Sequence, residues 1–111
     1  MAGRIHRVTM FKIVDEGQQK QLIDQYKVMQ SAEKDGKPYI HNLIVGLAAE
    51  DPRAQGFTVV SKSEFASLED MKFYDEGCTA HAALKAYAKE NITVSGFMSV
   101  YFEPSFIANS V

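Results

Sequence analysis

The feature that most constrains the fold of this sequence is an alternation of side chains that is typical of β-strands. Apolar side chains occur on both faces of these segments. Residues 5–14 alternate with a period of two, which is typical of a β-strand. Residues 57–65 and 94–102 repeat the alternation, and the apolar, branched run 39–47 is interpreted as a further strand. An apolar sheet face must be buried against another element. The sequence therefore predicts a sheet that is covered on both sides.

Helical segments are predicted between these strands. The segment 16–33 has Asp15 as a suitable N-cap residue and carries an apolar stripe at positions i, i+4 and i+7. A second helical region begins after the cap Ser67, is interrupted at Gly77 and resumes with Thr79 as the expected cap. Each helical region connects two strands, so the elements alternate along the chain.

The resulting order is β-α-β-β-α-β, the ferredoxin-like split unit, which is an α+β fold with one four-stranded antiparallel sheet. Residues 1–104 are predicted to form this single domain, followed by the C-terminal tail 105–111, which is either loose or bound to a partner. Both helical regions cover the same face of the sheet. The other face is large and apolar for a monomer, so we expect a homodimer that is formed through the sheet.

Composition and charge exclude several classes of protein. Twelve Lys and Arg residues stand against fourteen Asp and Glu residues, and the formal net charge of −2 does not favour nucleic-acid binding. The single cysteine, Cys78, excludes a disulfide scaffold. No window approaches the roughly 20 apolar residues of a membrane span, and the N-terminus has no apolar signal core. We therefore expect a cytoplasmic protein that contacts neither nucleic acid nor membrane.

Several segments resemble the stress-responsive dimeric α/β-barrel (Dabb) domain family. Residues 4–13 are similar to its first strand, Gly56-Phe57-Thr58 to the start of its third strand, and residues 64–70 to its strand-to-helix junction; Tyr74 and His81 resemble its Tyr…His segment. The resemblance covers residues 4–104 and implies a dimeric α/β barrel of ferredoxin-like protomers. Many members are stress-associated proteins, and some plant members are cofactor-free polyketide cyclases or hydroxynitrile lyases.

Tyr74 and His81 are the catalytic candidates that the resemblance implies. In cyclase-type members a His of this segment is the general base and a Tyr polarises a carbonyl group. An imidazole with the ordinary pKa of about 6.5 can accept a proton at neutral pH, which suits the role of general base. The spacing in this chain is one residue longer, and Gly77-Cys78 replaces the usual His-Pro. The alternative interpretation is that His81 only packs or caps locally at a helix start.

The first strand departs from the family at a histidine. The family carries a His five residues before the lysine that aligns with Lys12, and this position is Arg7, with His6 one residue earlier. A shift of one residue along a strand moves a side chain to the opposite face. We therefore expect His6 on the dimer side and Arg7 in the pocket, although His6 also fits a structural role.

The pocket is expected between the helices and the sheet. Val59 stands where cyclase-type members carry a further His, and Ser61 and Ser63 replace residues that are commonly apolar. A cavity of this polarity suits a smaller, acidic or hydroxylated ligand, and the alternative is a partly hydrated sheet face. The predicted ligand-binding residues are Arg7, Thr9, Phe11, Leu22, Tyr26, Val59, Ser61 and Tyr87.

Neither a metal nor a cofactor is expected. His6, His41 and His81 show no metal-ligand spacing, and the chain has no glycine-rich phosphate loop. Two functions remain open: a small-ligand-binding homodimer without chemistry, and a cofactor-independent cyclase or lyase that uses Tyr74 and His81. Monooxygenase activity occurs on similar barrels, but no motif in this sequence supports it.

Overall fold

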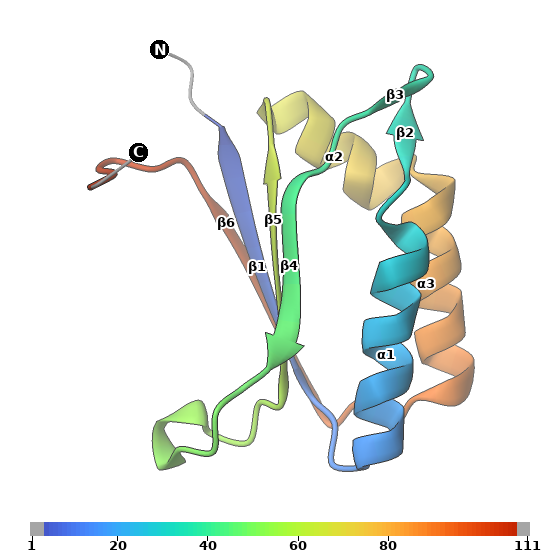
Figure 1. Ribbon diagram of the computed structural model, residues 1–111, viewed down its shortest axis with the longest axis vertical. Helices are drawn as coiled ribbons and strands as arrows, with labels where there is room; N and C mark the ends of the chain where they lie inside the picture. The colour runs from blue at the N-terminus through green and yellow to red at the C-terminus, as the bar shows by residue number, and fades with distance from the viewer. Residues whose placement is uncertain (1–3, 109–111) are drawn as a thin grey trace.

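The computed structural model describes residues 4–108, so the terminal residues 1–3 and 109–111 of the predicted domain and tail lie outside the described part. The sheet has the strand order β4-β5-β1-β6, and every neighbouring pair is antiparallel. All three α-helices lie on one side of it (Figure 1). The elements are β1 (Ile5–Lys12), α1 (Glu16–Met29), β2 (Glu33–Lys34), β3 (Lys37–Pro38), β4 (His41–Leu47), the 3₁₀ turn η1 (Pro52–Ala54), β5 (Val59–Phe65), α2 (Leu68–Glu76), α3 (Thr79–Asn91) and β6 (Gly96–Phe102).

The main core lies between the helices and the sheet. Every second residue of β5, from Val59 to Phe65, is buried on this side. Thr9 and Phe11 of β1 are buried beside them, opposite Ser61 and Val59. The largest fully buried side chains are those of Ile13, Leu22, Met29, Val59, Phe65 and Tyr74. The alternation read from the sequence therefore assigns the helix-facing residues of these strands correctly.

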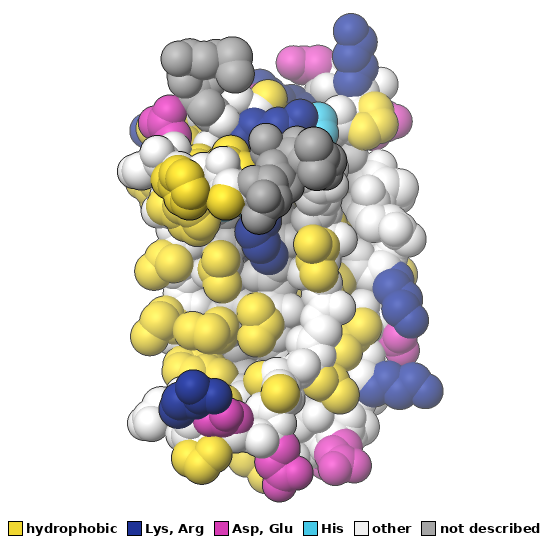
Figure 2. Space-filling model, turned by 60° about the vertical axis from the view of Figure 1, so that its left-hand side comes forward, with side chains coloured by type: hydrophobic (Ala, Val, Ile, Leu, Met, Phe, Trp, Pro, Cys, Tyr) yellow, Lys and Arg dark blue, Asp and Glu magenta, His cyan; other side chains and the backbone are white. Residues whose placement is uncertain are grey.

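The opposite face of the sheet is open, and we call it the open face. Rows of apolar side chains cross it (Figure 2). One row pairs Val60, Met10 and Met98 across three strands, and the next contains Val8 and Val100. Val100 is 53% exposed. Exposed apolar rows of this extent indicate a contact surface.

Two of the three expected helix caps are confirmed. The Asp15 carboxylate accepts a hydrogen bond from the Gln18 amide at 2.9 Å, and Ser67 Oγ accepts one from the Asp70 amide at 3.1 Å. The prediction that Thr79 caps the third helix is wrong. Thr79 is already the first helical residue, because the Cys78 carbonyl accepts the first intrahelical hydrogen bond from Ala82. Cys78 is the N-cap and gives no side-chain hydrogen bond.

The expected extent of the first helix is also wrong. Helix α1 ends at Met29, and residues 33–38 form the short hairpin β2–β3. Asp35 and Gly36 at its turn both have positive φ angles, of 53° and 77°. An Asp-Gly pair with this backbone is the preferred two-residue hairpin turn. The turn pairs Glu33 with Pro38, so Glu33 belongs to a strand and not to the helix.

Candidate functional site

A cleft of about 210 Å³ opens between α3 and the β1–β6 side of the sheet. Helix α3 contributes a stripe with the spacing i, i+3, i+4 and i+7, which places its side chains on one helix face. The strands supply the floor, and α1 and α2 supply one residue each. The lining residues are Arg7, Thr9, Phe11, Tyr26, Asp75, His81, Leu84, Lys85, Ala88 and Phe97.

Arg7 is the charged centre of this cleft. Its side chain is only 12% exposed. The guanidinium donates from Nη1 to Thr9 Oγ1 at 2.8 Å and from Nη2 to Asp75 Oδ1 at 3.0 Å, and its Cζ atom lies 5.3 Å from the centre of the Tyr74 ring. Thr9 Oγ1 is in turn 3.0 Å from Ser99 Oγ. These contacts hold the guanidinium cation in a fixed position in the wall of the cleft.

His81 is buried and lies against Tyr74. The two rings are stacked, with 3.7 Å between their centroids and 13° between their planes. His81 Nδ1 is 2.8 Å from the main-chain oxygen of Tyr74. A carbonyl oxygen can only accept, so Nδ1 carries the proton and donates it, and Nε2 keeps its lone pair. Burial is the main cause that lowers the pKa of His81, to about 4, so the imidazole is neutral at neutral pH.

The hydroxyl group of Tyr74 contacts the Met29 sulfur at 3.5 Å inside the core. Burial raises the pKa of this phenol well above its ordinary value. Tyr74 is not among the residues that line the cleft, whereas His81 is. The structure therefore brings the two predicted catalytic rings together, and it places the Tyr74 hydroxyl beside a thioether.

The predicted ligand-binding residues divide into two groups. Arg7, Thr9, Phe11 and Tyr26 line the cleft, and the others do not. Leu22 and Val59 are fully buried core residues. The remaining two are Ser61, which is buried, and Tyr87, which packs against the core.

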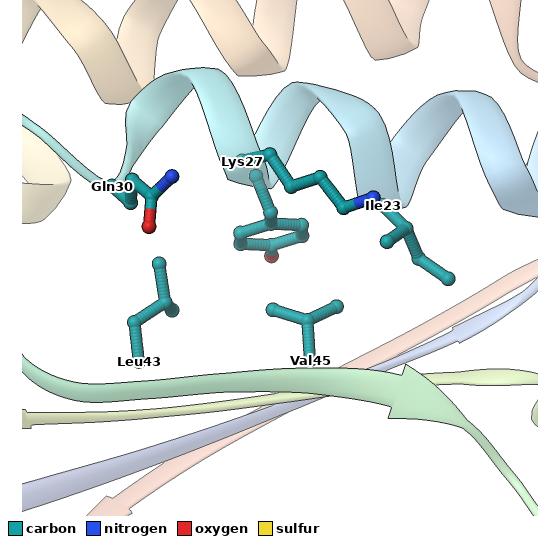
Figure 3. Close-up of a pocket in the computed structure, with 6 residues that line it drawn as sticks. Ile23, Lys27, Gln30, Leu43 and Val45 are labelled. Atoms are coloured by element: carbon teal, nitrogen blue, oxygen red, sulfur yellow. The ribbon is translucent and has the colours of Figure 1, made fainter.

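Tyr26 also lines a second, smaller pocket of about 140 Å³ between α1 and β4. In Figure 3 Ile23 of α1 and Gln30, the C-cap of that helix, lie on one side of this pocket, opposite Leu43 and Val45 of β4, while the Lys27 side chain runs along the helix toward Ile23. Burial raises the pKa of the Tyr26 phenol, and hydrogen bonding to Ser61 acts in the opposite direction. Tyr26 therefore contributes to the walls of both pockets.

His6 and Arg7 lie on opposite faces of the sheet, as expected from the one-residue shift. His6 stacks on Phe102 of the open face, with 5.3 Å between the ring centroids. Its Nδ1 atom lies 3.7 Å from Glu64 Oε1. His6 is therefore separated from the cleft by the sheet itself, whereas Arg7 enters the cleft.

Five cleft residues were not predicted as site residues. Leu84, Lys85 and Ala88 follow His81 at i+3, i+4 and i+7, so helical periodicity counted from His81 would have found them. Phe97 pairs with Phe11 across β6 and β1. Asp75 carries no such signal, because it reaches Arg7 only through the packing of α2 against the sheet.

Within residues 4–108, no group of three or more His, Cys, Asp or Glu side chains is arranged to hold a metal ion. In the same part of the chain, no helix has both the length and the apolar character that crossing a membrane requires.

A curated relative and two solved structures are similar to this chain. The Fusaristatin A biosynthesis cluster protein of Gibberella zeae is 43% identical over 105 residues, which cover 94% of this chain and 75% of the relative. A hydroxynitrile lyase from Passiflora edulis superimposes with a TM-score of 0.72 at 17% identity, covering 94% of this chain and 95% of that one. A dimeric protein of ferredoxin-like fold from Bacteroides fragilis gives 0.68 at 24% identity, covering 91% and 96%.

The structural similarities are at low sequence identity, and they show the ferredoxin-like fold. The family model described as the stress responsive A/B barrel domain, Dabb, matches residues 5–98, which is most of the chain. Together with the 43% identical relative, this match shows that the protein belongs to the Dabb family of stress-responsive A/B barrel domains.

Proposed function

We propose that this protein is a homodimer that binds a small molecule in the cleft between α3 and the sheet. The observation that supports this proposal most strongly is the combination of polar groups and apolar walls inside the cleft. A largely buried, hydrogen-bonded guanidinium and a neutral imidazole lie among apolar walls made by Phe11, Leu84 and Phe97. A concave apolar pocket with a few convergent polar groups is the usual form of a small-molecule site.

The dimer part of the proposal rests on the open face. Its apolar rows have no covering element in residues 4–108 (Figure 2). A second copy would bring the same rows against them and make a self-complementary interface. The ferredoxin-like protein from Bacteroides fragilis is described as dimeric, which supports this arrangement. A cytoplasmic location stays a prediction.

Binding is tested by titrating the ¹⁵N-labelled protein with a set of small phenols, ketones and carboxylic acids. We expect amide shifts to cluster at Thr9, His81 and Leu84. The matched variant Ala88→Phe places a ring in the cleft mouth and should abolish these shifts while the protein stays dimeric. Unchanged spectra with every compound, or equal binding by Ala88→Phe, would contradict the proposal.

A cofactor-independent lyase or cyclase is the second candidate function. It is favoured by the His81 tautomer, because a donated Nδ1 proton leaves Nε2 able to accept a proton from a substrate. In a lyase step this nitrogen would take the hydroxyl proton of a hydroxynitrile. The carbon–nitrile bond would then break, giving a carbonyl compound and cyanide, which leaves with the bonding electron pair. Tyr74 would act as hydrogen-bond donor only if its hydroxyl turned from Met29 toward the cleft.

The lyase hypothesis is tested with mandelonitrile as the probe and release of cyanide as the readout. We expect His81→Gln and Tyr74→Phe to abolish turnover while the melting temperature changes little. Turnover that survives in both variants would exclude this pair as the catalytic groups. The cleft could still bind a ligand in that case, as the titration above measures separately.

A further inference from the structure

The guanidinium of Arg7, a residue that lines the cleft, keeps hydrogen-bond donors that residues 4–108 do not use. An arginine side chain presents five N–H donors in a fixed fork. Among the described residues, the hydrogen bonds of the side chain account for one donor to Thr9 and one to Asp75. The contact of Arg7 with Tyr74 is to the aromatic ring, with Cζ 5.3 Å from the ring centroid. A carboxylate that binds this guanidinium through two hydrogen bonds would take one unused donor and the donor that now bonds to Asp75.

The charges around the cleft do not balance. Arg7 and Lys85 are cationic, Asp75 is the one carboxylate among the lining residues, and His81 is neutral. The Lys85 ammonium donates to the main-chain oxygen of Asp75 at 3.1 Å. The cleft is thus positive although the whole chain carries a net charge of −2. A partly desolvated positive site favours an anion, and guanidinium–carboxylate pairs are among the strongest hydrogen-bonded pairs in proteins.

Asp75 approaches Arg7 from the direction of solvent. Its side chain is 38% exposed, against 12% for Arg7. Asp75 lies in the last turn of α2, one residue before the final helical residue Glu76. A ligand that enters the cleft from outside would meet the same edge of the guanidinium that the Asp75 carboxylate now occupies.

From these contacts we infer that the cleft takes a small monocarboxylate, whose carboxyl group displaces Asp75 from Arg7 while its apolar body lies between Phe11, Leu84 and Phe97. This inference rests on the proposed small-ligand function. The volume of about 210 Å³ limits the size of the ligand. Asp75 then acts as an internal competitor for Arg7.

The test compares acids with their neutral amides in the whole protein. Benzoate and hexanoate are titrated beside benzamide and hexanamide, and dissociation constants come from the ¹⁵N amide shifts of cleft residues. We expect each acid to bind at least about tenfold more tightly than its amide, in line with a charge-assisted hydrogen bond. Arg7→Gln should remove this preference, whereas the exposed-site control Lys20→Gln, which loses the same charge, should retain it.

The variant Asp75→Asn distinguishes displacement of Asp75 by the ligand from simple attraction of the ligand to Arg7. Because this variant removes the competing carboxylate, we expect it to bind benzoate about three- to tenfold more tightly, and Arg7→Lys to bind it more weakly than the wild type. These two variants decide the inference even when Arg7→Gln does not fold. Equal binding of acid and amide would overturn the inference and leave the small-ligand function standing. Weaker benzoate binding by Asp75→Asn would also overturn it, by making Asp75 a support for Arg7. Failure of every compound to shift the cleft residues would overturn both.

Discussion

The two faces of the sheet are formed by the same strands but carry different kinds of side chain. The helix-covered face places polar groups in the middle of its apolar core, where Thr9 meets Ser99 and Arg7 meets Asp75. The open face carries apolar rows, with Lys62 in the row of Val8 and Val100 and with a charged cluster around Glu64 at one end. A polar group inside a protein needs a hydrogen-bond partner, and the helix-covered face supplies one. This difference is the basis of our proposal that the helix-covered face holds a ligand and that the open face meets a second copy.

The charged end of the open face limits how two copies can meet. Glu64 lies 3.6 Å from an Arg4 nitrogen and 3.4 Å from the Lys62 ammonium. Although burial opposes it, hydrogen bonds from Asn42 and Lys62 and the charge of His6 lower the pKa of the Glu64 carboxyl. The rims of protein interfaces are polar, so this cluster favours a dimer in which the charged end of each copy lies at the rim of the contact.

The largest effect is expected from a charge in the centre of the open face. Val100→Glu brings one carboxylate from each copy into the apolar contact, and juxtaposed like charges cost several kcal/mol. We expect the dissociation constant of the dimer to rise by roughly a thousandfold, which corresponds to about 4 kcal/mol. Sedimentation velocity at micromolar concentration measures this change.

The matched control for that variant is Val28→Glu, on the solvent side of α1, where the valine is 73% exposed. It adds the same charge to a helix surface and should leave the dimer intact. If both variant dimers dissociate to the same extent, or if neither dissociates, the open face is not the contact surface.

On the helix-covered face, the largest effect is expected from loss of the Tyr74 ring. This ring is fully buried, stacks on His81 and packs at 5.2 Å from Phe65. Tyr74→Ala should lower the free energy of unfolding by about 3 to 5 kcal/mol, as other large-to-small aromatic substitutions in cores do. Urea denaturation measures it.

Tyr74→Phe is the matched control for that variant, because it separates the contribution of the hydroxyl group from that of the ring. It keeps the ring and removes only the hydroxyl contact with the Met29 sulfur, so we expect a loss below about 1 kcal/mol. A loss as large as that of Tyr74→Ala would mean that the hydroxyl, and not the ring, holds this part of the core.

A smaller effect than the loss of the Tyr74 ring is expected in a pH dependence that is specific to the helix-covered face. Burial lowers the pKa of His81 to about 4 in the folded protein, below the ordinary value of 6.5. The unfolded chain therefore binds a proton first, and the stability that His81 contributes is complete above pH 6.5 and is lost as the pH falls toward 4.

The measurement compares the free energy of unfolding at pH 7 and pH 5 for the wild type and for His81→Gln. We expect the wild type to lose about 1 to 2 kcal/mol more than the variant over this interval. An identical pH dependence of the two proteins would show that His81 is not buried as a neutral imidazole.

Much of this fold is predictable from local sequence because the strand period assigns faces directly. Arg7 and His6 are neighbours in sequence, and the alternation alone separates them onto opposite faces. The end of α1 was not predictable from the apolar stripe, which continues to Ala32. The deciding feature was the Asp35-Gly36 turn, whose two positive φ angles form the β2–β3 hairpin.

The site was less predictable than the fold, for a physical reason. Arg7 and Asp75 are 68 positions apart in the chain, and only the packing of α2 brings them together. The direction of the Tyr74 hydroxyl depends on Met29, which belongs to α1. Periodicity orders residues within one element, whereas these contacts join different elements.

The most direct experiment is sedimentation equilibrium of the wild-type protein at micromolar concentration. If the open face joins two copies, the mass in solution is twice the 12.4 kDa of one chain. Folded protein that sediments at 12.4 kDa over the whole concentration range would contradict the assignment of the open face to a second copy.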